Sequence, residues 1–231
     1  MKQPNHCLFD SGLRLTPLPD TEQEVLRAGA LFGPVNHCKE TGQAAPEGPV
    51  LVYTGRGASE DQVKRLFRPG ESAIQSKYLI FSGHGLADAH NGMLSCIALA
   101  SPAADSGDDG FLQAQEVMDL QLDADLVMLS ACQTGLGRLR GGEGLVGLST
   151  AFFVAGTESV CASLWQVPSG PTSQLVTEFF RRLKGGQLDR AEALRQAQLT
   201  VMRQGRGPNG EPADYSSPFC WAAFVLNGEW R

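Results

Sequence analysis

The chain lacks the features that mark nucleic-acid-binding, membrane-spanning and secreted proteins. Among its 231 residues, 19 basic and 25 acidic side chains give a net charge of −6, and there is no run rich in Lys or Arg. We therefore expect no direct nucleic-acid partner, because a phosphate backbone attracts clustered positive charge. The apolar stretches are short and residues 1–6 contain no signal-peptide core. We accordingly expect a cytoplasmic protein with no membrane partner.

Metal-binding and nucleotide-binding patterns are also missing. The six cysteines form no Cys-x-x-Cys pair, which disfavours both a disulfide framework and the common zinc sites. The pairs His6-Cys7 and His37-Cys38 do not suit one metal ion, because neighbouring residues on an extended chain point to opposite sides. The glycine-rich segment 135–144 lacks the Gly-Lys-Ser/Thr of a phosphate-binding loop. We expect no metal and no organic cofactor.

What the sequence does contain is an alternation of apolar runs and amphipathic segments. Its length suits one domain, residues 1–231, with a loop-rich lead-in over about residues 1–20. Alternating strands and helices are typical of a three-layer α/β sandwich, in which a mainly parallel central sheet has helices on both faces. The predicted strands are residues 50–53, 78–81, 93–99 (at an edge), 126–129, 159–164 and 221–226. The predicted helices are residues 21–31, 59–67, 112–120, 145–155, 172–183 and 189–204.

Two of the predicted helices begin with a capping-box pattern. In this motif a Ser or Thr side chain and a Glu or Gln three residues later bond to free backbone N–H groups of the first turn. Thr21 with Glu24 fits the pattern, and so does Ser59 with Gln62. We therefore predict that Glu24 caps the first helix.

A histidine and a cysteine follow two of the predicted strands. His84 comes shortly after the run 78–81, and Cys132 shortly after the run 126–129. Side chains just beyond the carboxyl ends of neighbouring parallel strands converge on one crevice. The separation, 132 − 84 = 48 residues, leaves room for the crossover that parallel pairing requires. The sequence therefore permits a Cys/His dyad.

Such a dyad suits peptide-bond cleavage. Cysteine is strongly nucleophilic as the thiolate, and an imidazole can accept the thiol proton and supply a proton to the departing amine. Each residue also has a simpler interpretation. Free cysteines are often buried core side chains, which is how we interpret Cys161, and His84 alone would be a hydrogen-bonded loop histidine.

Longer stretches around both residues strengthen the dyad interpretation. Residues 129–135 read Leu-Ser-Ala-Cys-Gln-Thr-Gly, and residues 141–144 read Gly-Gly-Glu-Gly. Together with other stretches in the same order along the chain, they resemble the CHAT domain, a caspase-like cysteine peptidase family often joined to tetratricopeptide repeats. These other stretches are residues 18–25, 81–85, 109–112, 156–160, 163–167, 193–198 and 221–224.

The resemblance implies a caspase-like sandwich and a cysteine endopeptidase with His84 and Cys132 as catalytic residues. It also implies that the backbone N–H groups of Gly85 and Cys132 form the oxyanion hole. The implied partners are a protein or peptide substrate and a regulatory protein or tetratricopeptide-repeat partner, because no 34-residue repeat is visible in this chain. Relatives of this kind are associated with bacterial signalling and defence.

Four further residues are candidates for substrate binding. Ser130 occupies the position two before the cysteine, where caspases have glutamine. Glu143 either shapes a pocket or is a solvated loop carboxylate. Ser163 and Trp165 belong to a segment that resembles the caspase strand along which an extended peptide pairs. Trp165 either walls a pocket or packs at the rim of the core.

Two alternatives to a peptidase remain open from the sequence. The first is a catalytically latent caspase-like module that acts as an adaptor. The second is another thiol acyl-transfer enzyme, such as an amidase for small substrates, which would require a closed pocket in place of an open groove lined by a strand.

Overall fold

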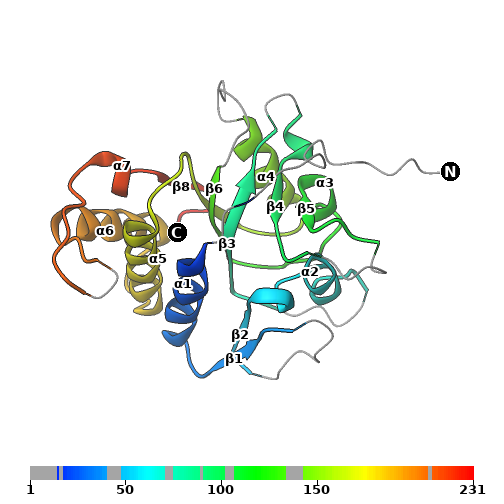
Figure 1. The fold of residues 1–231 in the computed structure, drawn as a ribbon, viewed down its shortest axis with the longest axis horizontal. Helices are drawn as coiled ribbons and strands as arrows, with labels where there is room; N and C mark the ends of the chain where they lie inside the picture. Colours follow the sequence, from blue (N-terminus) through cyan, green and yellow to red (C-terminus); the bar gives the residue numbers. More distant parts are fainter. Residues whose placement is uncertain are drawn as a thin grey trace.

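The computed structural model describes residues 15, 18–40, 48–70, 75–88, 91–101, 107–133, 143–207 and 210–231. At residues 19, 131–133 and 143–145 it describes the backbone but not the side chains. A six-stranded sheet lies between two groups of helices (Figure 1). No helix in the described part of the chain has the length and apolarity needed to cross a membrane.

The central sheet is mixed, so the predicted mainly parallel sheet is not confirmed. Its strand order is β5-β4-β3-β6-β7-β8, and only the β3–β6 and β6–β7 pairs are parallel. The other three neighbouring pairs are antiparallel. The strands are β3 (Tyr78–Leu86), β4 (Cys96–Ala98), β5 (Phe111–Gln113), β6 (Leu126–Gln133), β7 (Ser159–Ser163) and β8 (Phe224–Gly228).

The connections explain the mixed directions. The link from β3 to β4 is too short for a parallel crossover, which usually takes a dozen or more residues, so β4 folds back antiparallel. Helices α5 (Ser169–Lys184) and α6 (Arg190–Arg203) separate β7 from β8. Two successive helices return the chain to the end of β7 from which it left, and β8 therefore runs in the opposite direction.

Two helical layers bury the two faces of the sheet. Helices α1 (Pro19–Ala30), α5 and α6 cover one face, while α2 (Glu60–Leu66), α3 (Ala114–Val117) and α4 (Glu143–Val154) cover the other (Figure 1). Side chains alternate between faces along each strand. Thus Leu126 and Met128 of β6 pack with α5, whereas Val127 and Leu129 pack with α4. Each layer has its own buried core.

The first helix differs from its prediction at its N-terminus. It begins at Pro19 with Leu18 as N-cap, and no side chain caps it. Thr21 Oγ1 bonds instead to the Leu18 carbonyl oxygen, at 2.7 Å, and Glu24 is only 3% exposed. The predicted capping box of α1 is therefore wrong, because the helix starts two residues earlier and turns Glu24 toward the sheet.

At α2 the capping prediction holds in part. Ser59 is the N-cap of α2, and the Gln62 N–H donates to its side chain at 3.3 Å. Phe67 is buried, with Val63 and Leu66 packed beside it. The apolar side chains of this helix therefore pack together into the core on one face of the sheet.

Other differences from the predicted elements are at the edges. Residues 93–99 contain a 3-10 turn, η2 (Gly92–Leu94), followed by β4, which is the second strand from the edge. The edge strand is β5, where the sequence predicted the start of a helix. At the C-terminal end, a short helix α7 (Pro218–Trp221) occupies the start of the predicted last strand.

A second, two-stranded parallel sheet lies outside the central one. It pairs β2 (Val50–Tyr53), which was predicted, with β1 (Val35–Cys38), which lies outside the predicted strands and helices. A 3-10 turn, η1 (Gly55–Gly57), follows β2. A cavity of about 860 Å³ separates this sheet from the first half of β3 and is also lined by α1 and α2. Residues 78–82 of β3 line the cavity, and residues 78–84 are half-buried, less covered than the predicted buried strand.

Candidate functional site

The histidine and cysteine positions lie opposite each other on neighbouring strands. Strands β3 and β6 are parallel, and their register pairs His84 with Cys132. Both positions are near the carboxyl ends of their strands, so the prediction that the two meet at one edge of the sheet is supported by the backbone. For Cys132 the structure describes the backbone alone; the His84 side chain is half-buried.

These two positions belong to the face of the sheet that carries α1. Tyr78 and Ile80 of β3 pack in the same core as Leu126 and Met128 of β6. Because side chains alternate along a strand, the even-numbered positions that follow on both strands belong to that face. His84 is one of them, and its Cα partner on β6 is position 132.

Strand β4 forms the other neighbour of β3 at this level. It pairs Ala98 with His84 and Ile97 with Gly85, and Gly85 is also in register with Gln133 of β6. Gly85 therefore has a strand on each side. To take part in an oxyanion hole, the Gly85 N–H would have to point toward a bound substrate.

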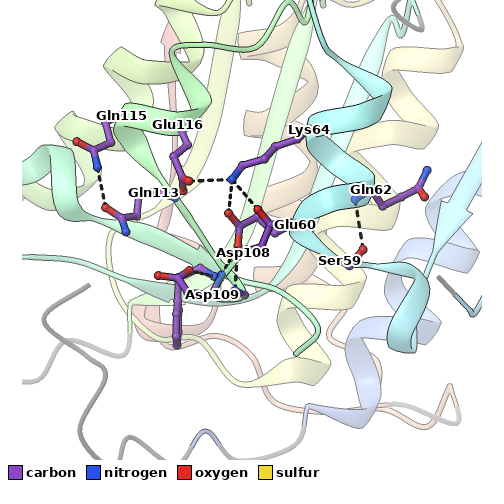
Figure 2. Close-up of polar contacts among 11 residues, drawn as sticks. Ser59, Glu60, Gln62, Lys64, Asp108, Asp109, Gln113, Gln115 and Glu116 are labelled. Atoms are coloured by element: carbon purple, nitrogen blue, oxygen red, sulfur yellow. Dashed lines mark hydrogen bonds and ion pairs between the residues drawn. The ribbon is translucent and has the colours of Figure 1, made fainter. Parts of the chain in front are cut away.

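A network centred on Lys64 holds the β5 side of the sheet against α2. Figure 2 shows Lys64 reaching Glu60, Asp108 and Glu116, with Nζ–O distances of 3.1 Å to Asp108 and 2.8 Å to Glu116. Glu60, itself 2% exposed, accepts from the backbone N–H of Gly110 at 2.8 Å. The network thus joins α2 to the residues just before β5 and to α3.

Lys64 is the positive partner of three carboxyl groups in this network. Burial lowers the pKa of Lys64, but its hydrogen bonds to Glu116, Glu60 and Asp108 outweigh that effect and raise the pKa above its ordinary value. The lysine ammonium therefore stays charged and neutralises part of the acidic cluster. In the described part of the chain, no group of three or more His, Cys, Asp or Glu side chains is arranged to hold a metal ion.

Glu24, which was predicted to cap the first helix, is a buried carboxyl group close to the site. Ser82 Oγ donates to Glu24 Oε1 at 2.9 Å, joining α1 to β3. Burial raises the pKa of the Glu24 carboxyl to about 7, although the neighbouring serine hydroxyls lower it. Ser130, the register partner of Ser82, is the second of these neighbours but forms no hydrogen bond of ordinary geometry.

The segment leading into α1 lies on the same part of β3. Leu15 packs against Leu86, two residues after His84, and Glu24 bonds to Ser82, two residues before it. The other end of α1 lies at the start of β3, where the rings of Phe32 and Tyr78 are 5.4 Å apart. Helix α1 therefore runs opposite to β3, with its first turns toward His84. Residues predicted as a loop-rich lead-in thus flank the site.

The predicted substrate-binding residues have different surroundings. Ser130 and Ser163 are buried, with 4% and 2% of their surfaces exposed. Trp165 is partly buried against the core, and its Nε1 donates to the Phe219 carbonyl at 3.0 Å. Glu143 is the first residue of α4, and its side chain lies outside the described residues, as do residues 135–142 of the glycine-rich segment.

The strand that was expected to receive a peptide is already paired on one side. Ser163 is in register with Phe224 of β8, and the Leu164 N–H donates to the Ala223 carbonyl at 2.8 Å. On the other side, the β6–β7 pairing extends only to Leu129 with Ala162. An added peptide strand would therefore have to approach from the β6 side, where Cys132 is located.

Comparison with known families identifies the family of this chain. A family model described as the CHAT domain matches residues 1–229. The chain belongs to the CHAT domain family. This family is caspase-like. The chain has a mixed α/β architecture in which positions 84 and 132 lie opposite each other on adjacent strands.

Two mammalian proteins are similar to half of this CHAT domain. Tetratricopeptide repeat protein 28 of Mus musculus is 34% identical over 117 residues, and that of Homo sapiens is 32% identical over 117 residues. In each case the match covers 51% of this chain and 4% of the relative. The similarity therefore concerns one small region of much longer repeat proteins.

Proposed function

We propose that this CHAT domain is a cysteine endopeptidase that cleaves a protein or peptide partner through His84 and Cys132. The observation that carries the proposal is the register of β3 and β6, which pairs the two positions at the carboxyl ends of adjacent parallel strands. Open α/β sheets bind their ligands at that edge.

The proposed chemistry needs no group beyond the chain and water. Cys132 Sγ attacks the scissile carbonyl carbon while His84 takes the thiol proton. Collapse of the tetrahedral intermediate breaks the C–N bond, the amine leaves with the proton from His84, and a thioester remains. Water then attacks the thioester with His84 as base, which releases the acid and restores the thiol. We assign no metal or organic cofactor to this function.

Stabilisation of the oxyanion is assigned to the backbone N–H groups of Gly85 and Cys132. Donors fixed at the position of the developing charge contribute strongly to acyl transfer. Gly85 is the residue after the proposed base, and its lack of a Cβ permits close approach of a carbonyl oxygen. This assignment follows the family resemblance and requires that the Gly85 N–H be directed toward the substrate.

The proposed substrate is an extended peptide that pairs beside Ser163 and Trp165. The β8 side of this segment is occupied, so the peptide would lie on the β6 side, with its scissile bond near Cys132. Main-chain hydrogen bonds would hold it, and Trp165, Ser130 and Glu143 would shape the pockets. We further propose that a regulatory protein, such as a repeat-containing partner in a bacterial signalling or defence system, triggers activity.

The test is cleavage of a diverse peptide library, with products identified by mass spectrometry. The native chain is compared with Cys132→Ala and His84→Ala, and Cys220→Ala is the matched control because Cys220 lies on α7, away from β3 and β6. We expect cuts with the native chain and the control, and none with the two dyad variants. Cleavage that survives Cys132→Ala would refute the assignment.

A latent interaction module is the second candidate, because both mammalian relatives are named for their repeats rather than for an activity. Such a module would bind a partner protein equally well as the native chain and as Cys132→Ala, and would cleave none. The cavity of about 860 Å³ offers less support for an amidase of small substrates, since it reaches Ser82 but is lined neither by His84 nor by Ser130.

A further inference from the structure

Glu24 is a charged group in an unusual place. Its side chain is 3% exposed, whereas most glutamates are largely solvated. It lies in α1, and its carboxyl group accepts a hydrogen bond from Ser82 on β3. Burying a carboxyl group costs free energy unless strong partners compensate, and the single ordinary hydrogen bond from Ser82 is modest compensation.

The position of this carboxyl group relates it to the proposed dyad on both strands. Ser82 precedes His84 by two residues, and its register partner Ser130 precedes Cys132 by two residues. Residues two apart on a strand share a face and lie about 7 Å apart. The Glu24 carboxyl group is thus one strand repeat from the dyad positions, on the same face of the sheet and bonded to the strand that carries His84.

We propose that Glu24 is a positioning residue whose carboxylate favours the imidazolium that forms when His84 takes the proton of Cys132. The inference rests on the proposed function of the dyad. A negative charge beside a histidine stabilises its protonated form, as the aspartate does in Ser-His-Asp triads. Here the charge lies on the neighbouring helix α1. In the described structure the Glu24 carboxyl group bonds to Ser82 and not to the histidine.

The other charged groups around Glu24 are compatible with this role. Asp20, one turn earlier on α1, raises the pKa of Glu24 slightly through its own charge. On the opposite side of α1, Glu22 bonds to Lys39. From α5, Lys184 reaches the Leu31 carbonyl, two turns away from Glu24. The neighbours on β3 and β6 are Ser82, Ser130 and the dyad positions themselves. In the described structure, no cation therefore neutralises the carboxylate.

The test measures the reactivity of Cys132 directly, so that it does not depend on finding a substrate. The full chain is alkylated with iodoacetamide between about pH 5.5 and 8.5, and the rate at Cys132 is followed by mass spectrometry of the peptide that contains it. The variant is Glu24→Gln, which keeps the size and a hydrogen-bond acceptor but removes the charge. Glu22→Gln, the same substitution at a half-buried glutamate of α1 that bonds to Lys39, is the control.

We expect the ratio of native to Glu24→Gln rates to be near one at low pH, where Glu24 is protonated, and to rise to roughly fivefold above pH 7. The ratio for Glu22→Gln should stay near one throughout. A merely structural role would change the rate equally at every pH, so a flat ratio for Glu24→Gln would overturn the inference. A native-like pH profile of the alkylation rate in Glu24→Gln would overturn it too.

One further variant separates this inference from the proposed function. If His84→Ala leaves the alkylation of Cys132 unchanged, the dyad itself is refuted and Glu24 has nothing to position. If His84→Ala slows alkylation while Glu24→Gln gives a flat ratio, the dyad stands and only the role of Glu24 fails.

Discussion

Replacing Glu24 with glutamine is expected to stabilise the fold at neutral and alkaline pH. Glu24 is buried in the interface between α1 and the sheet, and burial raises its pKa from the ordinary value of 4.5 to about 7. Ionisation is therefore harder in the folded chain than in the unfolded chain. Glutamine fills the same space and can bond to Ser82, but it has no charge to bury.

The magnitude follows from linkage between protonation and folding. Below about pH 4.5 the carboxyl group is protonated in both states and contributes no penalty. As the pH rises from 4.5 to about 7, the unfolded chain loses this proton before the folded chain does, so stability falls. A pKa difference of about 2.5 corresponds to about 3 kcal/mol. Above pH 7 the variant should be more stable than the native chain by about that amount.

Urea unfolding measured at several pH values from about 4.5 to 8.5 tests this reasoning. Glu22→Gln again supplies the matched control. The hydrogen bond with Lys39 lowers the pKa of Glu22, so its loss should give no gain in stability at neutral pH. A Glu24→Gln variant whose stability relative to the native chain is constant with pH, or falls as pH rises, would show that Glu24 is not the buried acid described here.

Three other predictions concern the elements around the site. Lys64→Met should destabilise the fold by roughly 2–4 kcal/mol in the same urea assay, since it leaves Glu60 buried without its cation. Arg65 is more exposed than Lys64, so Arg65→Met should cost less than about 1 kcal/mol. Ser59→Ala should cost about 1 kcal/mol through loss of the α2 cap. Gly147→Ala should cost about 1–3 kcal/mol, because a Cβ there would lie 2.2 Å from the Gly92 carbonyl oxygen and force α4 away from η2; an unchanged melting temperature would contradict that packing.

Much of the central architecture could be predicted because it depends on local patterns. The runs 78–81 and 126–129 are apolar enough to identify β3 and β6, and parallel pairing then brings His84 opposite Cys132. The direction of β8 could not be read in the same way. It depends on how the two successive helices α5 and α6 return the chain to the sheet, which is a property of the assembled layers rather than of any one segment.

The incorrect assignment of Glu24 has a similar cause. Thr21 and Glu24 have the spacing of a capping box, and within the sequence nothing distinguishes a glutamate that bonds to its own helix from one that faces a sheet. The difference is that α1 begins at Pro19, so that Glu24 lies beyond the first turn and its side chain bonds to Ser82 instead of the helix N-terminus. Ser82, which donates the hydrogen bond to Glu24, is 58 residues further along the chain, so no local pattern could have linked the two.

The two effects predicted for Glu24 have opposite consequences for the protein, and that opposition is informative. Removal of the carboxylate should make the fold more stable above pH 7, yet it should make Cys132 less reactive. A residue that reduces stability through burial of its charge is most readily understood at a functional site, where activity is often maintained at the expense of stability. If Glu24→Gln gains stability but the reactivity of Cys132 does not change, Glu24 only destabilises the fold. If the same variant also makes Cys132 less reactive, Glu24 is a positioning residue for His84.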